Sequence, residues 1–153
     1  MSVQDFYPFE SLEATGLSLI PLRVRYKLDC AGVRLRLSQW QAMTSEEKGQ
    51  LLRLPVATQG DLDEYRAALS QMTDRQGAAV LVDEPGAGKQ DWRNLDAWPA
   101  VVVRQCEIQA LPLPPVLRWR ELAESDRHAL FVLARSNHSQ TEFLAAMALL
   151  CGR

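Results

Sequence analysis

A lysine beside a glycine-rich turn is the pattern in this sequence that most directly suggests chemistry. The segment PGAGK, residues 85–89, ends like a phosphate-binding loop, in which backbone amides and a lysine hold phosphate groups. That motif also needs a glycine at the position of Asp83 and a hydroxyl side chain at the position of Gln90 to bind magnesium. Pro99 follows so closely that no long helix is expected to point its N-terminus at a phosphate. We therefore interpret the segment as a loop and not as a nucleotide site.

The cysteines and histidines show no spacing that predicts a metal site or a reactive thiol. No CxxC pair occurs among the three cysteines, which is typical of buried free thiols in a reducing compartment. Two histidines are too few for a zinc site without the cysteines, and no HExxH or Cys/His ligand spacing is present. We expect no metal ion, no cofactor and no catalytic residue. The residues concerned are Cys30, Cys106, Cys151, His128 and His138.

Basic side chains are concentrated in residues 21–37, where they outnumber acidic ones. Such a cluster suits an acidic partner surface or a phosphate-bearing ligand. The simpler interpretation is a solvated surface in which Arg25 pairs with Asp29, four residues further on. Aromatic side chains for base stacking are not interleaved there, so we do not expect nucleic acid as a partner. The basic cluster consists of Arg23, Arg25, Lys27, Arg34 and Arg36.

A second candidate binding site is the polar turn at residues 135–138, which separates two apolar segments predicted to be buried helices. Polar side chains on a turn with rigid flanks, here Arg135 and His138, are suited to binding a partner. Local capping of the two helix ends would explain the same residues equally well. Ser136 and His138 could be a nucleophile and a base, but no orienting acid or oxyanion donor accompanies them. We therefore predict that the protein is not an enzyme.

Length and composition limit the kinds of fold that can position these residues. The chain has 153 residues, 47% of them hydrophobic and 24% charged, and a net charge of -2, as expected for one ordinary globular domain over 1–153. No apolar run is long enough for a membrane helix, and the N-terminal residues do not resemble a secretory signal. We therefore expect a cytoplasmic protein with no membrane partner.

An internal repeat is the most informative feature of the organisation. Residues 21–73 align with residues 99–150 at an offset of 78 or 79, and the Gly/Pro/Asp-rich residues 74–98 would connect the two halves. An ordered series of matches over about fifty residues favours a duplicated supersecondary unit. The matched pairs include Pro21 with Pro99, Val24 with Val102, Trp40 with Trp119, Leu51 with Leu130, Leu54 with Leu133, Glu64 with Glu142, and Tyr65 with Phe143. The two tryptophans are interpreted as core anchors.

Short motifs mark where the helices of each half should begin and end. Pro21 is suited to the first turn of a helix, and Gly32 to the position just after its last residue. Serine, threonine or aspartate followed three residues later by glutamate or glutamine predicts further helix starts. These starts are Ser38 with Gln41, Thr44 with Glu47, and Asp61 with Glu64, and Ser125 is expected to cap a helix of the second half.

Two segments bear on the fold class. The alternating VRLRL, residues 33–37, predicts a short extended segment. The valines of residues 99–109 favour a strand, whereas the repeat favours a helix there. The predicted class is mainly α: a compact helical domain built from two pseudo-repeats of about three helices each, with short extended segments.

Most of the chain outside residues 74–98 resembles a known family. The run FESLEATGLSLIPLRVRYKLDCAGVRLRLSQW, followed by a helix ending in LLRLP, resembles the nitrate reductase associated protein family. The segment LARSNHSQTEF resembles the part of that family that precedes its last helix. The residues that carry the resemblance are Ile20, Pro21, Val24, Arg25, Lys27, Leu28, Asp29, Gly32, Leu37, Trp40, Arg135, His138 and Phe143.

The resemblance implies a small cytoplasmic accessory protein that supports assimilatory nitrate reductase. The implied role is to help produce active enzyme by protein binding, at molybdenum cofactor insertion or at cluster assembly, with no catalysis of its own. The candidate contacts are the basic cluster and the turn with Arg135 and His138. The alternative is a ligand-binding or sensor protein that holds an anion or a pterin in a cleft between the pseudo-repeats.

Overall fold

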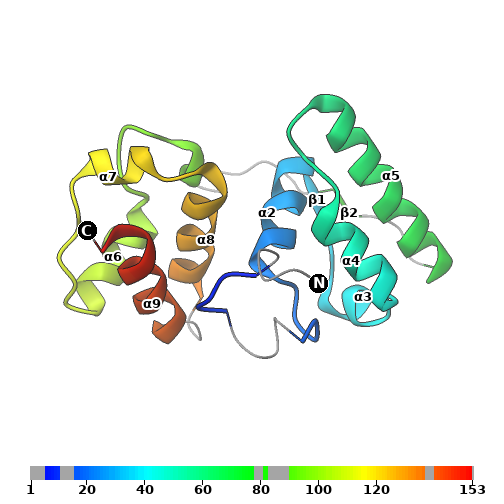
Figure 1. The fold of residues 1–153 in the computed structure, drawn as a ribbon, viewed down its shortest axis with the longest axis horizontal. Coiled ribbons are helices and arrows are strands. Elements are labelled where there is room, and N and C mark those ends of the chain that lie inside the picture. Colours follow the sequence, from blue (N-terminus) through cyan, green and yellow to red (C-terminus); the bar gives the residue numbers. More distant parts are fainter. Residues whose placement is uncertain (1–5, 11–15, 78–80, 83–89, 137–139, 153) are drawn as a thin grey trace. The chain divides into compact units, whose positions relative to one another are not determined.

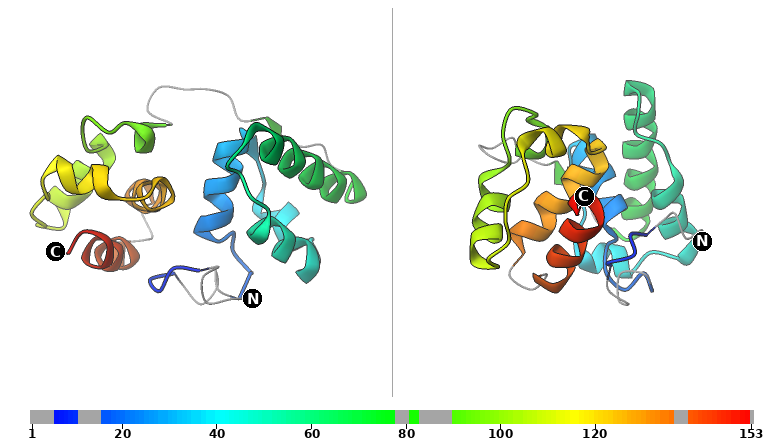
Figure 2. Two further views of the ribbon diagram at one scale, coloured as in Figure 1. Left: turned by 45° about the horizontal axis from the view of Figure 1, so that its top comes forward. Right: turned by 60° about the vertical axis from the view of Figure 1, so that its left-hand side comes forward.

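The computed structural model shows a mainly helical chain, which confirms the predicted fold class (Figure 1 and Figure 2). The structure describes residues 6–10, 16–77, 81–82, 90–136 and 140–152. The chain forms two compact units, Met1–Glu84 (unit 1) and Pro85–Arg153 (unit 2). The boundary between these units falls inside the connector expected at 74–98.

Unit 1 holds four helices among its described residues, together with a pair of very short strands. Its elements are α2 (Leu22–Ala31), β1 (Val33–Arg34), α3 (Leu37–Gln41), α4 (Ser45–Arg53), α5 (Gln59–Arg75) and β2 (Leu81–Val82). β1 and β2 pair antiparallel, with Val33 opposite Val82. The strand covers only the first two residues of the extended segment expected at 33–37, and Leu37 already begins α3. Helix α2 packs against both α4 and α5, and these two helices also pack against each other.

Unit 2 is arranged around helix α8, which has more buried residues than any other described helix of the unit. Its elements are η2 (Asp91–Arg93), α6 (Ala100–Ile108), α7 (Val116–Glu121), α8 (Glu124–Arg135) and α9 (Gln140–Cys151). α8 packs against η2, α6 and α9. Residues 100–108 are therefore helical, and the strand alternative for this segment is wrong. The weak preference of valine for strands is outweighed by helix packing, which buries Val102, Gln105 and Cys106 on one side.

Helix α2 ends and helix α4 begins as the sequence predicts. Gly32 follows α2 with φ 67° and ψ 32°, a left-handed conformation that glycine adopts without a steric penalty. At the start of α4, the hydroxyl of Thr44 accepts a hydrogen bond from the backbone of Glu47 at 3.1 Å. The Glu47 carboxylate accepts one from the backbone of Thr44 at 2.8 Å, which completes a capping box.

Three other predicted helix starts are wrong by two or three residues, because neighbouring residues cap the helices instead. Helix α3 begins after Arg36, whose backbone N–H donates to the Gln39 side chain at 2.8 Å. Helix α5 begins after Thr58, whose hydroxyl accepts from the backbone of Asp61, while the Asp61 carboxylate accepts from the backbone of Thr58. Asp61 is thus the third residue of α5 and not its cap. The superseded caps are Ser38, Asp61 and Ser125.

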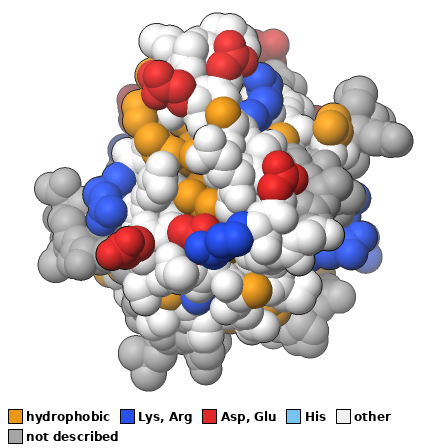
Figure 3. All heavy atoms as spheres, turned by 90° about the vertical axis from the view of Figure 1, so that its right-hand side faces the viewer, with side chains coloured by type: hydrophobic (Ala, Val, Ile, Leu, Met, Phe, Trp, Pro, Cys, Tyr) orange, Lys and Arg blue, Asp and Glu red, His pale blue; other side chains and the backbone are white. Residues whose placement is uncertain are grey.

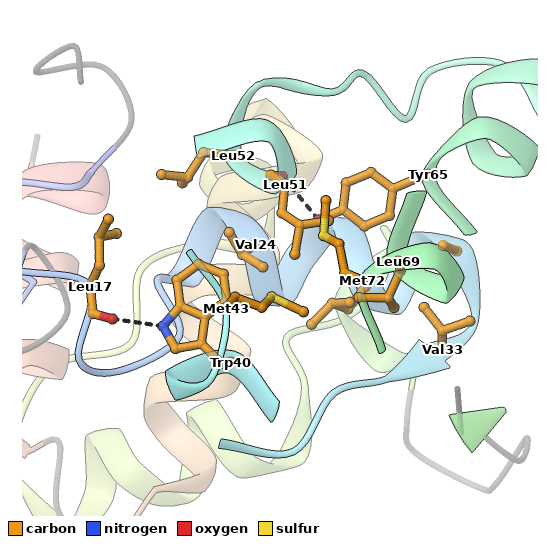
Figure 4. Close-up of a cluster of buried hydrophobic side chains, with 12 residues drawn as sticks. Leu17, Val24, Val33, Trp40, Met43, Leu51, Leu52, Tyr65, Leu69 and Met72 are labelled. Carbon is orange, nitrogen blue, oxygen red and sulfur yellow. Dashed lines mark hydrogen bonds between the residues drawn. The ribbon is translucent and has the colours of Figure 1, made fainter. Parts of the chain in front are cut away.

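The core of unit 1 lies between α2, α3, α4 and α5 (Figure 4). Val24, Trp40, Leu51 and Tyr65 have no exposed surface. The buried Tyr65 hydroxyl donates a hydrogen bond to the carbonyl of Leu51 at 2.9 Å, so α4 and α5 are joined by a polar contact as well as by packing. Burial raises the pKa of Tyr65, so this hydroxyl remains a donor.

The described helices follow the same order in both units. α2 and α6 each begin directly after a proline, and α3 and α7 each carry a tryptophan with no exposed surface. α5 and α9 each bury an aromatic side chain at matching positions, Tyr65 and Phe143. Each unit has four α-helices in the described part of the chain, and unit 2 also has the 3-10 helix η2, where the sequence suggested about three helices.

Candidate functional site

In unit 1, the buried tryptophan of α3 is held by a preceding loop and by a cation. The indole Nε1 of Trp40 donates a hydrogen bond to the carbonyl of Leu17 at 2.8 Å (Figure 4). The Lys48 ammonium donates to the same carbonyl at 3.2 Å and lies 5.5 Å from the centre of the Trp40 ring. The carbonyl of Leu17 therefore joins the loop before α2 to both α3 and α4.

Unit 2 contains a comparable arrangement at the aligned positions. The indole Nε1 of Trp119 donates to the carbonyl of Asn94 at 2.7 Å, and the Arg127 guanidinium lies 5.9 Å from the ring centre. Arg127 is 8% exposed and donates to the carbonyls of Trp92 at 3.0 Å and Leu122 at 2.5 Å. Its charged group therefore joins η2 to the junction of α7 and α8.

These two sites have the geometry of structural anchors. Trp40 and Trp119 have no exposed surface, which agrees with their interpretation as core anchors and leaves no ring face for a ligand to stack on. A cation over an aromatic ring adds a modest attraction that increases when the pair is removed from water. The donor groups of Lys48 and Arg127 described here are directed to backbone carbonyls.

The structure divides the basic cluster into side chains that stabilise the fold and side chains that face solvent. The guanidinium of Arg23 lies over the ring of Tyr7, 4.3 Å from its centre, and Tyr7 in turn stacks on Phe9 at 4.9 Å. Arg25 is exposed, and its Nε donates to the carbonyl of Ile20 at 3.3 Å. Arg23 therefore holds the N-terminal segment 6–10 against α2.

Lys27 caps the end of a neighbouring helix. Its ammonium donates hydrogen bonds to the carbonyls of Leu52 and Leu54, each at 2.6 Å, at the C-terminal end of α4. These carbonyls have no partner within the helix, and a positive charge there also interacts favourably with the helix dipole. The sequence predicted that Lys27 contributes to a binding surface. Its hydrogen bonds in the structure instead stabilise the packing of α2 against α4 in unit 1.

Glu10 completes the attachment of the N-terminal segment. One carboxylate oxygen accepts from the backbone N–H of Tyr7 at 2.9 Å, and the other accepts from that of Leu22 at 3.2 Å, in the first turn of α2. Burial raises the pKa of the Glu10 carboxyl, although both hydrogen bonds and the charges of Arg23 and Arg25 oppose this. No sequence pattern around Glu10 predicts this role, because its partner in α2 lies 12 residues further along the chain.

Arg34 and Arg36 are the members of the basic cluster that remain oriented towards solvent. Arg34 lies on β1 and Arg36 directly precedes α3, and both are exposed. Among the described residues, neither guanidinium forms an ion pair. These two side chains are exposed and could contact an acidic surface.

The second predicted site is only partly described. Arg135, the last residue of α8, is exposed, and its guanidinium lies 5.3 Å from the centre of the Phe131 ring. His138 lies outside the described residues. The structure therefore provides one exposed cation at this turn, held by an aromatic ring of its own helix.

No metal-binding arrangement occurs in the described part of the chain. Its His, Cys, Asp and Glu side chains form no group of three that could hold a metal ion. Burial raises the pKa of Cys106 and raises that of Cys151 to about 11, so neither thiol is poised as a nucleophile. In the same part of the chain, no helix has the length and apolar character needed to cross a bilayer.

Comparison with known proteins gives one match that covers nearly the whole chain. The model of the conserved nitrate reductase-associated protein family matches residues 6–150, a range that includes both units and every residue of the basic cluster. No curated protein and no solved structure matches the chain. The chain therefore belongs to the family of conserved nitrate reductase-associated proteins.

Proposed function

We propose that this protein is a non-enzymatic accessory factor that supports assimilatory nitrate reductase in the cytoplasm by binding to it. The observation that carries the proposal is the family match over residues 6–150. The anchors around Trp40 and Trp119 agree with this role, because the aromatic and cationic groups that could bind a small ligand are used for internal contacts. We therefore expect the protein to bind its partner through exposed side chains.

The basic side chains that face solvent are the proposed partner contact in unit 1. Arg34 and Arg36 are exposed, whereas Lys27 caps a helix and Arg23 stacks on Tyr7. Clustered cations at the rim of an interface accelerate association with an acidic surface, and salt weakens this effect. We therefore narrow the proposed contact from the whole cluster to Arg34 and Arg36.

Binding to the purified reductase tests this proposal. Arg34→Glu and Arg36→Glu are each expected to weaken binding about tenfold at low salt and less at high salt. Arg104→Glu is the matched control, because Arg104 is also exposed but lies on α6 of unit 2. Equal affinities for all three variants would exclude the basic contact, and no binding by the unaltered protein would exclude direct association with the reductase.

We further propose that the step assisted is insertion of the molybdenum cofactor. In this case, a host that lacks the protein accumulates reductase polypeptide with little bound cofactor. Measuring the reductase polypeptide and its molybdenum content in the same extracts separates insertion from synthesis. A normal metal content per polypeptide would place the role at another step.

A further inference from the structure

Helix α9 is apolar on the side that faces solvent as well as on the side that faces the core. Its buried side consists of Phe143, Ala146, Met147 and Cys151. On its exposed side, Leu144 is 37% exposed and Leu149 is 57% exposed. Ala145 and Ala148 lie between these leucines on the same side and are also exposed. These four residues are named the α9 strip: Leu144, Ala145, Ala148 and Leu149.

The aligned helix of unit 1 shows what a solvated surface looks like at these positions. At the offset of 78, the strip corresponds to a largely polar set on α5, where the two leucines are replaced by Arg66 and Gln71. The Arg66 guanidinium pairs with Asp63 at 3.1 Å. Figure 3, which shows the side of the molecule that carries α5, has acidic and basic side chains on it, with hydrophobic side chains between them. The corresponding set on α5 is Arg66, Ala67, Ser70 and Gln71.

The strip also contains no charge. Glu142 lies at the start of α9, and no ionisable side chain is exposed between it and Gly152. An acidic or basic partner surface would lose hydration at such a strip without gaining an opposite charge. A partner surface that packs against the strip is therefore expected to be uncharged and apolar.

The size of the strip indicates which kind of molecule covers it. The strip spans six residues, or about 9 Å of helix, and at a width of about 10 Å it offers about 90 Å². Two copies of the chain packed face to face through the strip would bury roughly 200 Å² in total, well below the 1,200 Å² or so of a stable interface. A larger partner that also touches the protein elsewhere is not limited in this way.

We propose that the α9 strip is a docking surface for an uncharged, apolar patch on nitrate reductase. This inference rests on the proposed function and adds a contact that differs in chemistry from Arg34 and Arg36. The arginines increase the rate of encounter and their contribution falls with salt, whereas the strip contributes apolar burial that salt does not screen. The two contacts can therefore be told apart by the salt dependence of binding.

The test measures binding of purified nitrate reductase to the full chain at low and at high salt. The double variant Leu144→Gln with Leu149→Gln is expected to bind at least tenfold more weakly at both salt concentrations. The control is Leu95→Gln, the same change at a side chain that is 42% exposed outside α9, and its affinity is expected to stay within twofold. Glutamine is a good helix former, so the double variant should keep its helical circular dichroism signal.

Each result decides the proposal. If the double variant binds within twofold of the unaltered protein, the docking surface is wrong and the accessory function stands. If the unaltered protein does not bind the reductase, both the accessory function and the docking surface are wrong. If the unaltered protein forms a dimer at high concentration that the double variant cannot form, the strip is a self-interface and the inference is overturned.

Discussion

Replacing Lys27 with methionine separates a fold-stabilising role from a binding role for this residue. The ammonium of Lys27 donates two hydrogen bonds of 2.6 Å to the last carbonyls of α4. Methionine keeps most of the apolar stem and removes the charge and both donors. Arg34→Met is the matched control, because it removes an exposed cation of the same cluster without breaking a described hydrogen bond or ion pair.

The size of the effect follows from the environment of these bonds. A hydrogen bond to a charged group contributes about 1.5–3 kcal/mol when it is well protected from water. Lys27 is only half-buried, so water replaces part of what is lost, and about 2 kcal/mol is expected for the two bonds together. A change of this size lowers the Tm of a chain of 153 residues by roughly 4–8 °C.

Urea unfolding provides the measurement. Circular dichroism follows the helices, and Trp40, the only tryptophan in the sequence of unit 1, gives a fluorescence signal that can be isolated by difference. Lys27→Met is expected to lower the free energy of unfolding by about 2 kcal/mol at an unchanged m-value, and Arg34→Met by less than about 0.5 kcal/mol. Equal unfolding midpoints for the two variants would refute the claim that Lys27 holds the end of α4.

Three further changes test other contacts. Trp119→Phe removes the indole N–H that donates to the carbonyl of Asn94 at 2.7 Å, and it should lower the free energy of unfolding in urea by about 1–3 kcal/mol. An unchanged free energy of unfolding would mean that water replaces the indole as the donor. Gly32→Ala should lower the free energy of unfolding by about 1–2 kcal/mol because of the φ of 67° alone, since the added methyl group would have no close neighbour within 4 Å. Gly32→Asn should lower it by less, because asparagine adopts the left-handed conformation more readily than alanine. Burial raises the pKa of the Glu10 carboxyl, so there is a pH range in which this carboxyl is protonated in the folded protein and ionised in the unfolded chain. The free energy of unfolding therefore falls as the pH rises through that range. Glu10→Gln should remove this part of the pH dependence, and parallel curves of unfolding free energy against pH for the two proteins would contradict the assignment.

The sequence predicted those elements whose signals are local. Gly32 after α2 and the Thr44–Glu47 capping box at α4 depend on residues at most three positions apart, and both are present. The start of α5 was misplaced because Asp61 can be either a helix cap or the third residue of a helix, and only the position of Thr58 decides between them. Helix boundaries of this kind depend on which of two nearby polar side chains accepts hydrogen bonds from the free backbone N–H groups at the start of the helix.

The roles of single residues in the candidate site were harder to predict, because they depend on distant partners. Lys27 reaches carbonyls that are 25 and 27 residues away, and nothing in its own segment distinguishes it from Arg34. Glu10 reaches the backbone of Leu22, 12 residues away, from a segment without regular structure. The uneven distribution of charge was visible in the sequence, but its division into internal and solvent-facing cations required the tertiary contacts.

Each unit is formed from one continuous stretch of chain, and this affects how the protein folds. The side-chain hydrogen bonds that join separate segments within the units span only 12 to 37 residues, from Glu10 with Leu22 to Gln76 with Gln39. Short loops of this kind are closed quickly, and domains that are contiguous in sequence begin to fold during synthesis, in the order in which they emerge. Unit 1 can therefore bury Trp40 while α8 and α9 are still being made. The ribosome then presents the apolar α9 only after α8, the helix that covers its inner side, is already available to receive it.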